Sequence, residues 1–116
     1  MRYTFIQPAS FSSDWARLRL TDDDLRALEN ELMARPEAGA VMAGTGGLRK
    51  ARFAPPSRRT GKSGAMRVCY VVFPNAGVCY LVALFPKNER ANLSAADKAT
   101  WRGWITQRRK ELRDES

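Results

Sequence analysis

Histidine is absent from this sequence of 116 residues. Its absence excludes acid–base catalysis by an imidazole and removes the ligand on which most protein zinc sites depend. Cysteine is scarce, since only Cys69 and Cys79 are present, in two neighbouring apolar segments. In the hairpin that we expect there, position 69 pairs near 82 and position 79 near 72, so the two thiols are not opposite each other. We therefore expect no disulfide and interpret both residues as small buried apolar groups.

Long apolar runs are also missing. No segment approaches the roughly 20 apolar residues that a membrane-spanning helix needs. The N-terminal sequence MRYTFIQPAS lacks the apolar region of a signal peptide, and the densest positive charge does not fall on an amphipathic helix. These features predict a cytoplasmic protein without a membrane partner. The length and the apolar content of 44% indicate one globular domain, residues 1–116.

Acidic residues are absent from the stretch 44–67, GTGGLRKARFAPPSRRTGKSGAMR, which carries seven basic residues and five glycines. The whole chain has a net charge of +8 and a pI near 10.2. A run of positive charge without counter-charge repels itself, and such runs are typical of proteins that bind polyanions. A solvated basic loop is the alternative. We favour a nucleic-acid site because part of the charge falls on a strand-like segment.

Apolar periodicity predicts an α+β domain. We expect a first strand at 3–6 and a short helix over 11–20, capped by Ser13 or Asp14. A second helix is expected to begin at Thr21 and to end at Pro36. Ser94 is expected to cap a last helix, with Asp97 at its third position. Further strands are predicted at 48–53, 66–73 and 78–85, with a short apolar segment at 40–42.

Several conspicuous residues have a structural interpretation that we prefer. The acidic triplet 22–24 could hold a metal, but it lies in a first helical turn, where capping and the helix dipole favour acidic groups. Tyr70 and Tyr80 are expected to pack within the hairpin, and Trp101 and Trp104 to form the apolar stripe of the last helix. We interpret the basic run 108–110 as a solvated helix end.

Strand alternation places Lys50 and Arg52 on one face of the sheet and Arg49 on the other. The expected hairpins put Arg52 beside Arg67, and Arg67 near Lys87. Like charges across a ladder are destabilising, so this cluster makes sense if a phosphate lies among them, because arginine forks match phosphate oxygens. Two hypotheses remain open here: simple phosphate binding, or catalysis in which a lysine of lowered pKa accepts a proton.

The segments GTGGLRKARF, GKSGAMRVCYVVF and VCYLVALFPKNERANLS, after LTDDDLRALENELMARPEAGAVM, resemble the HigB branch of the RelE/ParE toxin superfamily over roughly residues 1–105. The resemblance implies a RelE-like fold, a small twisted antiparallel sheet with two N-terminal helices packed on one face and a C-terminal helix. It implies the toxin of a type II toxin–antitoxin pair, a ribosome-dependent endoribonuclease that cleaves mRNA in the A site and inhibits translation.

The resemblance also implies roles for individual residues. The expected catalytic residues are Lys50, as acceptor of the 2′-OH proton, Arg67, stabilising charge on the phosphorus, and Arg52 and Lys87, holding the phosphate and assisting the leaving oxygen. The residues expected to contact RNA or the ribosome are Arg49, Arg58, Arg59, Lys62 and Arg90. No metal and no cofactor are implied. Leu93 stands near the position where RelE-type relatives carry a base-stacking tyrosine.

The implied partners are the ribosome, its mRNA and a cognate HigA-like antitoxin of the helix-turn-helix type, through which an oligomer is expected. Two alternatives share the fold or the charge. A ParE-like toxin would inhibit DNA gyrase, but that branch usually lacks a convergent basic site. A non-catalytic RNA-binding or ribosome-binding module would use the same charges only to hold phosphates.

Overall fold

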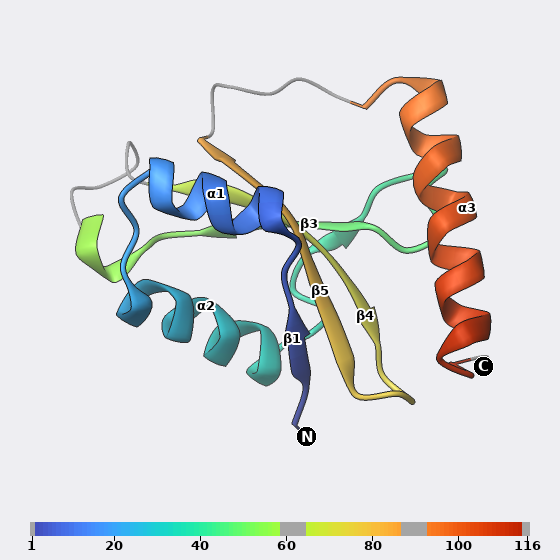
Figure 1. The fold of residues 1–116 in the computed structure, drawn as a ribbon, viewed down its shortest axis with the longest axis horizontal. Coiled ribbons are helices and arrows are strands. Elements are labelled where there is room, and N and C mark those ends of the chain that lie inside the picture. The colour runs from blue at the N-terminus through green and yellow to red at the C-terminus, as the bar shows by residue number, and fades with distance from the viewer. Residues whose placement is uncertain (1, 59–64, 87–92, 115–116) are drawn as a thin grey trace.

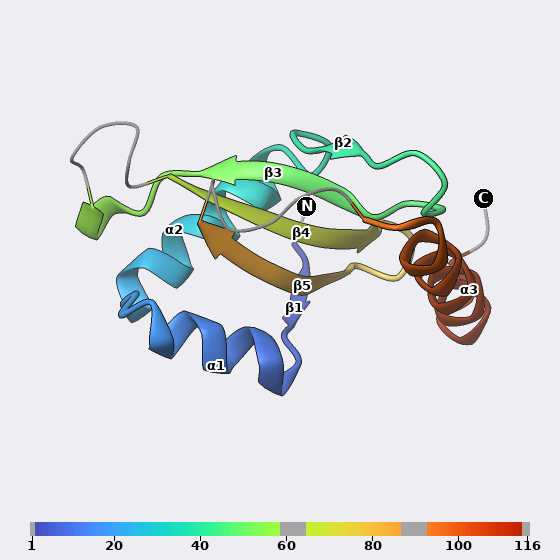
Figure 2. The same ribbon diagram turned by 90° about the horizontal axis from the view of Figure 1, so that it is seen from above.

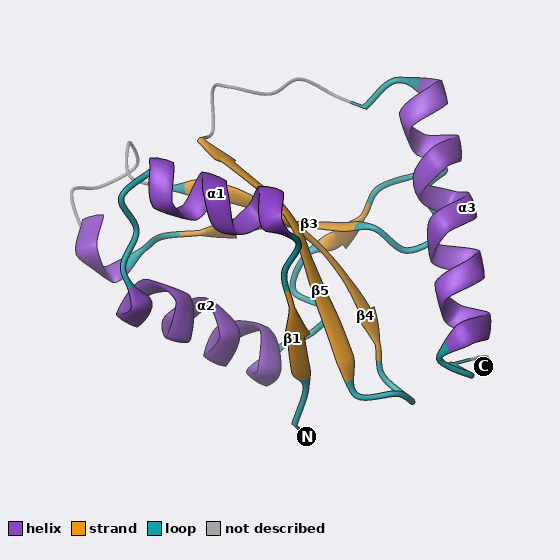
Figure 3. Ribbon diagram, viewed as in Figure 1, coloured by secondary structure: helices purple, strands orange, loops and turns teal. Residues whose placement is uncertain are grey.

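The computed structural model describes residues 2–58, 65–86 and 93–114, which form an α+β fold, as expected. One five-stranded sheet has the strand order β1-β5-β4-β3-β2 (Figure 1). Its strands are β1 (Thr4–Ile6), β2 (Ala40–Val41), β3 (Arg49–Phe53), β4 (Met66–Phe73) and β5 (Val78–Pro86). The helices, purple in Figure 3, are α1 (Ala9–Arg17), α2 (Asp22–Ala34), α3 (Ala95–Glu111) and the short 3₁₀ helix η1 (Pro56–Arg58).

The expectation of a wholly antiparallel sheet is wrong at one edge. β1 runs parallel to β5, with Thr4 opposite Val78, whereas β2, β3 and β4 form antiparallel pairs along the sheet. The sheet is therefore mixed. A three-residue strand whose partner lies far along the sequence has no connecting turn to set its direction, so the sequence pattern did not indicate it.

Helices pack against both faces of the sheet. Figure 2 shows α1 and α2 below the strands and α3 beside one end of them. α1 and α2 pack on one face and form the first core, in which Phe11 and Trp15 meet Leu28 and Leu32. α3 packs against the other face and forms the second core around Ile105, Val71 and Phe73. The expected apolar stripe of α3 is confirmed, because Trp101, Trp104 and Leu112 pack against this second core.

The helix starts follow two different rules. α2 and α3 begin with capping boxes, Thr21 with Asp24 and Ser94 with Asp97, as expected. The expected cap of α1 is wrong, because this helix begins after Pro8, several residues before Ser13. Phe11 and Trp15 explain the difference. They are the buried pair of α1, and residues four apart face the core together only when both lie in the helix, so the helix must begin before Phe11.

The hairpin registers are close to those expected. Arg52 lies opposite Arg67, and Cys79 lies opposite Val72. Cys69 lies opposite Ala83, one residue beyond the expected partner, because the β4–β5 ladder contains a register shift between Cys69 and Tyr70. The two cysteines belong to different cores, so the prediction that they form no disulfide with each other is confirmed.

Tyr70 holds the edge of the sheet against the end of α2. Its buried hydroxyl donates to the carbonyl of Pro36 at 2.8 Å and accepts from the N–H of Gly39 at 2.9 Å. A Cβ at Gly39 would lie 2.9 Å from the Lys50 carbonyl oxygen, so only glycine fits where this loop crosses β3. The tyrosine therefore fixes β2 beside the strand that carries Lys50.

The glycine-rich loop 44–47 packs against α3. Gly44 and Gly46 have positive φ angles of 80° and 77° and lie against side chains of this helix. Arg102 of α3 donates to the Gly44 carbonyl at 3.0 Å. The buried Thr45 hydroxyl donates to Met42 and accepts from the N–H of Leu48, which closes the loop. This loop is therefore an internal support.

No helix among residues 2–58, 65–86 and 93–114 combines the length and the apolar character that crossing a membrane requires.

Candidate nucleic-acid interface

Three basic residues converge on the face of the sheet that carries the second core. Lys50 and Arg52 alternate along β3 on the same face as Leu48, and Arg52 lies opposite Arg67 of β4. On this face, α3 packs against the second core, and its Trp101 lines a cavity together with Lys50. Arg52 is exposed, and Lys50 and Arg67 are half-buried. The convergence predicted for these three residues is confirmed; Lys87, predicted as the fourth, lies outside the described residues.

The cluster has no acidic counterpart in the described part of the chain. All the ion pairs found there join other residues, on α1, α2 and α3. Two arginines directly opposite each other on adjacent strands repel. The register therefore places uncompensated positive charge at a fixed position on the sheet, which costs stability unless an anion binds there.

Arg67 carries the most informative atom of the site. Its Nη1 is buried and has no hydrogen-bond partner among the described residues. A buried donor without an acceptor costs on the order of 1–3 kcal/mol, and more when it is charged. Native proteins rarely keep such a group without a reason. A phosphate between Arg67 and Arg52 would satisfy it once the half-buried Arg67 side chain turns this atom toward the surface.

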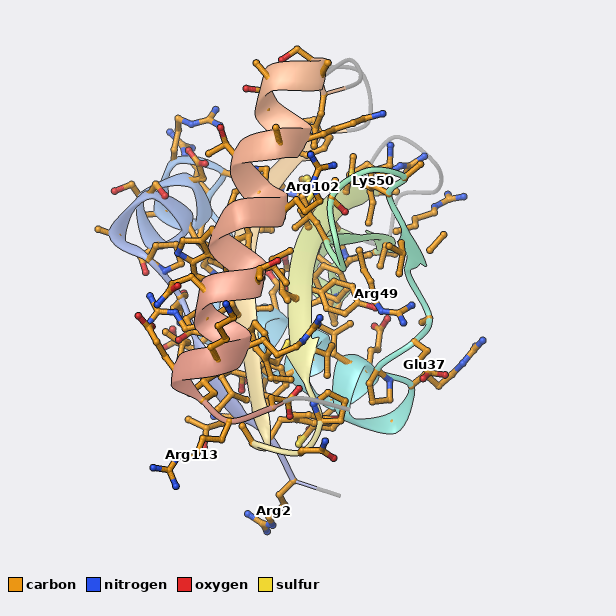
Figure 4. The ribbon with its side chains drawn as sticks, turned by 90° about the vertical axis from the view of Figure 1, so that its right-hand side faces the viewer. Arg2, Glu37, Arg49, Lys50, Arg102 and Arg113 are labelled. Carbon is orange, nitrogen blue, oxygen red and sulfur yellow. The ribbon has the colours of Figure 1, made fainter. Side chains whose placement is uncertain are left out.

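An apolar cavity of about 140 Å³ lies beside Lys50. Its walls include Met42, Phe85 and Trp101, with Leu93 at its rim. Figure 4 shows Lys50 on the side of Arg102, in the middle of α3, whose neighbour Trp101 lines this cavity. The arrangement combines a cationic head with an apolar slot that has aromatic walls. Such a slot suits a flat aromatic ring, as found in nucleobases.

The sequence did not reveal this cavity. Trp101 was recognised as a core residue, but its contribution to a surface slot depends on how α3 is placed on the glycine loop. That placement results from contacts between segments more than fifty residues apart, such as Arg102 to Gly44. The only local signal was the apolar stripe of α3, which also fits a purely structural role.

Arg49 is separated from the cluster. It follows the same strand but lies on the opposite face, where its Nη1 donates to the Gly39 carbonyl at 2.7 Å. Figure 4 shows it on the same side of the molecule as Glu37. Its predicted contact with RNA therefore cannot involve the same phosphate as Lys50 and Arg52.

The Arg58 side chain takes part in a contact that stabilises the fold. Its guanidinium donates to the carbonyl of Leu18, the residue that caps the C-terminal end of α1. A cation is favourable at this negative end of a helix dipole. Ser57, its neighbour in η1, is bound to Asp24 through both its N–H and its hydroxyl. These contacts anchor the start of the β3–β4 connection. Arg59, Lys62 and Arg90, the other residues expected to contact RNA, lie outside the described residues.

The basic run of α3 is not simply a solvated end. Arg108 lies over the rings of Tyr80 and Trp104 and pairs with Glu111 at 2.9 Å. Arg109 lies over the ring of Phe73, 5.7 Å from its centroid. Both guanidinia therefore contribute cation–π contacts to the second core.

Metal chemistry finds no support in the described ranges, where no three metal-binding side chains gather. The acidic triplet of α2 acts instead as the predicted cap. Burial by itself would raise the pKa of Asp24, but hydrogen bonds from Ser57 and Thr21 outweigh it and hold this pKa below its usual value. A carboxylate bound in this way is a structural acceptor.

No model of a known protein family matches the chain. Its function is therefore inferred from the residues and their geometry.

Proposed function

We propose that this protein is a RelE-like toxin of the HigB type, a ribosome-dependent endoribonuclease that cleaves mRNA and arrests translation. The observation that carries the proposal is the buried, unpartnered Nη1 of Arg67 directly across the ladder from Arg52. Lys50, on the same face, adds a possible proton acceptor. The set has no acidic member in the described residues.

The proposed chemistry needs only groups of this cluster. The Lys50 amine, in its neutral form, accepts the proton of a ribose 2′-OH, and the 2′ oxygen attacks the adjacent phosphorus. Charge that develops on the phosphate oxygens is stabilised by Arg67 and Arg52. The bond from phosphorus to the 5′ oxygen then breaks, leaving a cyclic phosphate and a 5′-OH that takes its proton from a cationic neighbour. Lys87 is the donor that the sequence offers, while Arg52 keeps its proton and stabilises the charge of the leaving oxygen.

The cavity beside Lys50 supplies a place for a base. A nucleotide whose phosphate lies between Arg52 and Arg67 can direct its ring toward Phe85 and Trp101. Base stacking on aromatic side chains is worth about 1–3 kcal/mol per base. In this proposal, the cavity takes the place of the stacking tyrosine that the sequence lacks near Leu93. The ribosome would orient the RNA and so provide part of the effective concentration.

The same proposal implies where the protein acts and what neutralises it. The protein would act in the cytoplasm, where ribosomes are, and a helix-turn-helix antitoxin would neutralise it. Such an antitoxin would either cover the basic face or prevent ribosome entry from another surface.

Primer extension on a defined mRNA, in a reconstituted translation mixture, tests the proposal. Wild-type protein is expected to cleave in the A site only when ribosomes are present. Arg67→Ala is expected to lower cleavage by about 100-fold or more, the usual effect of losing a group that stabilises an oxyanion. The variant should fold normally, because it removes a donor without a partner. Arg26→Ala, which removes one exposed charge on α2, is the matched control and should cleave normally.

The alternatives predict other results. A non-catalytic module would bind ribosomes in a manner that depends on Arg67 and would leave the mRNA intact. A gyrase inhibitor would lower DNA supercoiling and leave translation unchanged. Either outcome, obtained with folded wild-type protein, would reject the nuclease.

A further inference from the structure

A second and larger pocket lies on the face of β3 opposite Lys50. It has a volume of about 720 Å³, within the range of sites for small ligands. The end of α2, the loop that follows it, the β2–β3 edge and the C-terminal half of α3 form its walls. Nothing in the proposed nuclease chemistry uses this pocket.

Three arginines from three elements line the pocket: Arg35 after α2, Arg49 on β3 and Arg109 on α3. Glu37 is the one acidic residue of its lining, so three positive charges and one negative leave a net charge of +2. None of these arginines takes part in an ion pair found in the described ranges. The pocket therefore attracts an anion, because the Glu37 carboxylate balances only one of its three positive charges.

Two of the arginines are held in place by the fold. The Nη1 of Arg49 is bound to the Gly39 carbonyl at 2.7 Å, and Arg109 lies over the ring of Phe73. Each guanidinium has five donors, so these contacts orient the group while most of its donors stay available. A preorganised guanidinium loses less entropy when it binds an anion. Arg35 is exposed and completes the set from the opposite wall.

The rest of the lining includes the apolar residues Pro36, Val41, Val72 and Pro74. Tyr3 adds a phenol whose pKa is raised, chiefly by burial, so its hydroxyl stays protonated and can donate a hydrogen bond. A ligand that fits must therefore combine a compact anion with a flat or apolar body of moderate size.

We propose that this pocket binds a nucleotide, with its phosphate among Arg35, Arg49 and Arg109 and its base against the apolar walls. Arginine forks match phosphate oxygens bidentately, and the volume accommodates a base and a ribose. Lys50 and Arg49 are neighbours on opposite faces of one strand. The site is therefore separate from the Lys50 cluster, and it does not depend on the nuclease proposal.

Isothermal titration of the full chain with adenosine 5′-monophosphate, inorganic phosphate and adenosine tests this inference. The monophosphate is expected to bind at least about tenfold more tightly than either of its parts, because it fills both halves of the pocket. Arg35→Gln is the first variant to measure, since this exposed side chain can be replaced without disturbing the fold. It should weaken binding of the monophosphate by about tenfold, as should Arg109→Gln.

Arg26→Gln is the control, because it removes the same charge from an exposed position of α2 that lines neither pocket, and it should leave this affinity unchanged. Absence of binding to wild type, or affinity that neither arginine variant lowers, overturns the inference. Equal affinity for inorganic phosphate and the monophosphate overturns the role of the base. Cleavage of mRNA by Arg35→Gln should equal that of wild type, so failure of either proposal can be recognised separately.

Discussion

Replacement of Asp24 by alanine should destabilise the protein more than any single change at its surface. The carboxylate is fully buried and accepts three hydrogen bonds, from the Thr21 N–H at 2.9 Å, the Ser57 N–H at 3.0 Å and the Ser57 hydroxyl at 2.6 Å. It therefore joins the start of α2 to η1, two segments that are distant in the sequence. Alanine leaves all three donors without their acceptor.

The size of the effect can be worked from these contacts. Two bonds from Ser57 to a charged acceptor contribute about 1.5 kcal/mol each, at the lower end of the measured range. The loss of the capping box adds about 1 kcal/mol. Relief of the buried charge returns about 1 kcal/mol, since burial of a carboxylate opposes folding. The net loss is about 3 kcal/mol, or roughly 10 °C or more in the melting temperature of a domain of this size.

Urea unfolding at pH 7 measures this loss directly. Asp23→Ala is the matched control, because the Asp23 side chain is 88% exposed and forms only a surface ion pair with Arg26. It should change stability by less than about 0.5 kcal/mol. If Asp24→Ala unfolds at the same urea concentration as this control, the argument from the three hydrogen bonds is refuted.

Acid should reduce the difference between wild type and Asp24→Ala. Because the pKa of Asp24 is lowered in the folded protein, its contribution is complete above the unfolded value of about 3.9. It is lost as the pH falls through the lower folded value. The difference in stability between the two proteins should therefore shrink as the pH falls through that folded value, which unfolding curves at several acidic pH values would show.

Two further predictions concern the glycine-rich loop 44–47 and the buried thiol of Cys79. Gly46→Ala should destabilise by about 1–2 kcal/mol, because Gly46 has a φ of 77° and its Cβ would lie 3.3 Å from Arg102. Gly103→Ala, with open space around it on α3, should instead stabilise in the same unfolding assay. Burial raises the pKa of Cys79 to about 12, so only about one thiol in ten thousand is ionised at pH 8. A disulfide reagent should label Cys79 slowly in native protein and rapidly in urea. Rapid native labelling would contradict the burial.

Much of the sheet could be predicted because its signals are local. The hairpin predicted from the ends of β3 and β4, near Phe53 and Met66, places Arg52 opposite Arg67, as the structure shows. Thr21 and Ser94 also predict the starts of their helices, because each capping box is complete within four residues of sequence. These features depend on short-range geometry, which a single sequence expresses directly.

The rest depends on contacts between distant segments. The parallel direction of β1 is set by its place beside β5, and the cavity beside Lys50 by the docking of α3 on residues 44–47. The pocket of Arg35, Arg49 and Arg109 combines residues from three elements, none of which forms a motif with another. The sequence predicts that Arg109 lies at a solvated end of the helix, because its contact with Phe73 cannot be inferred from the helix alone.

Both edges of the sheet are formed by very short strands. β1 has three residues and β2 has two, while the long strands β4 and β5 lie inside the sheet. Long open edges invite strand addition and self-association, and short edge strands are one way in which proteins prevent it. The edge strands cover only residues 78–80 of β5 and 49–50 of β3. A chain that extended this sheet would therefore pair with the uncovered part of β5, and not with the short edge strands.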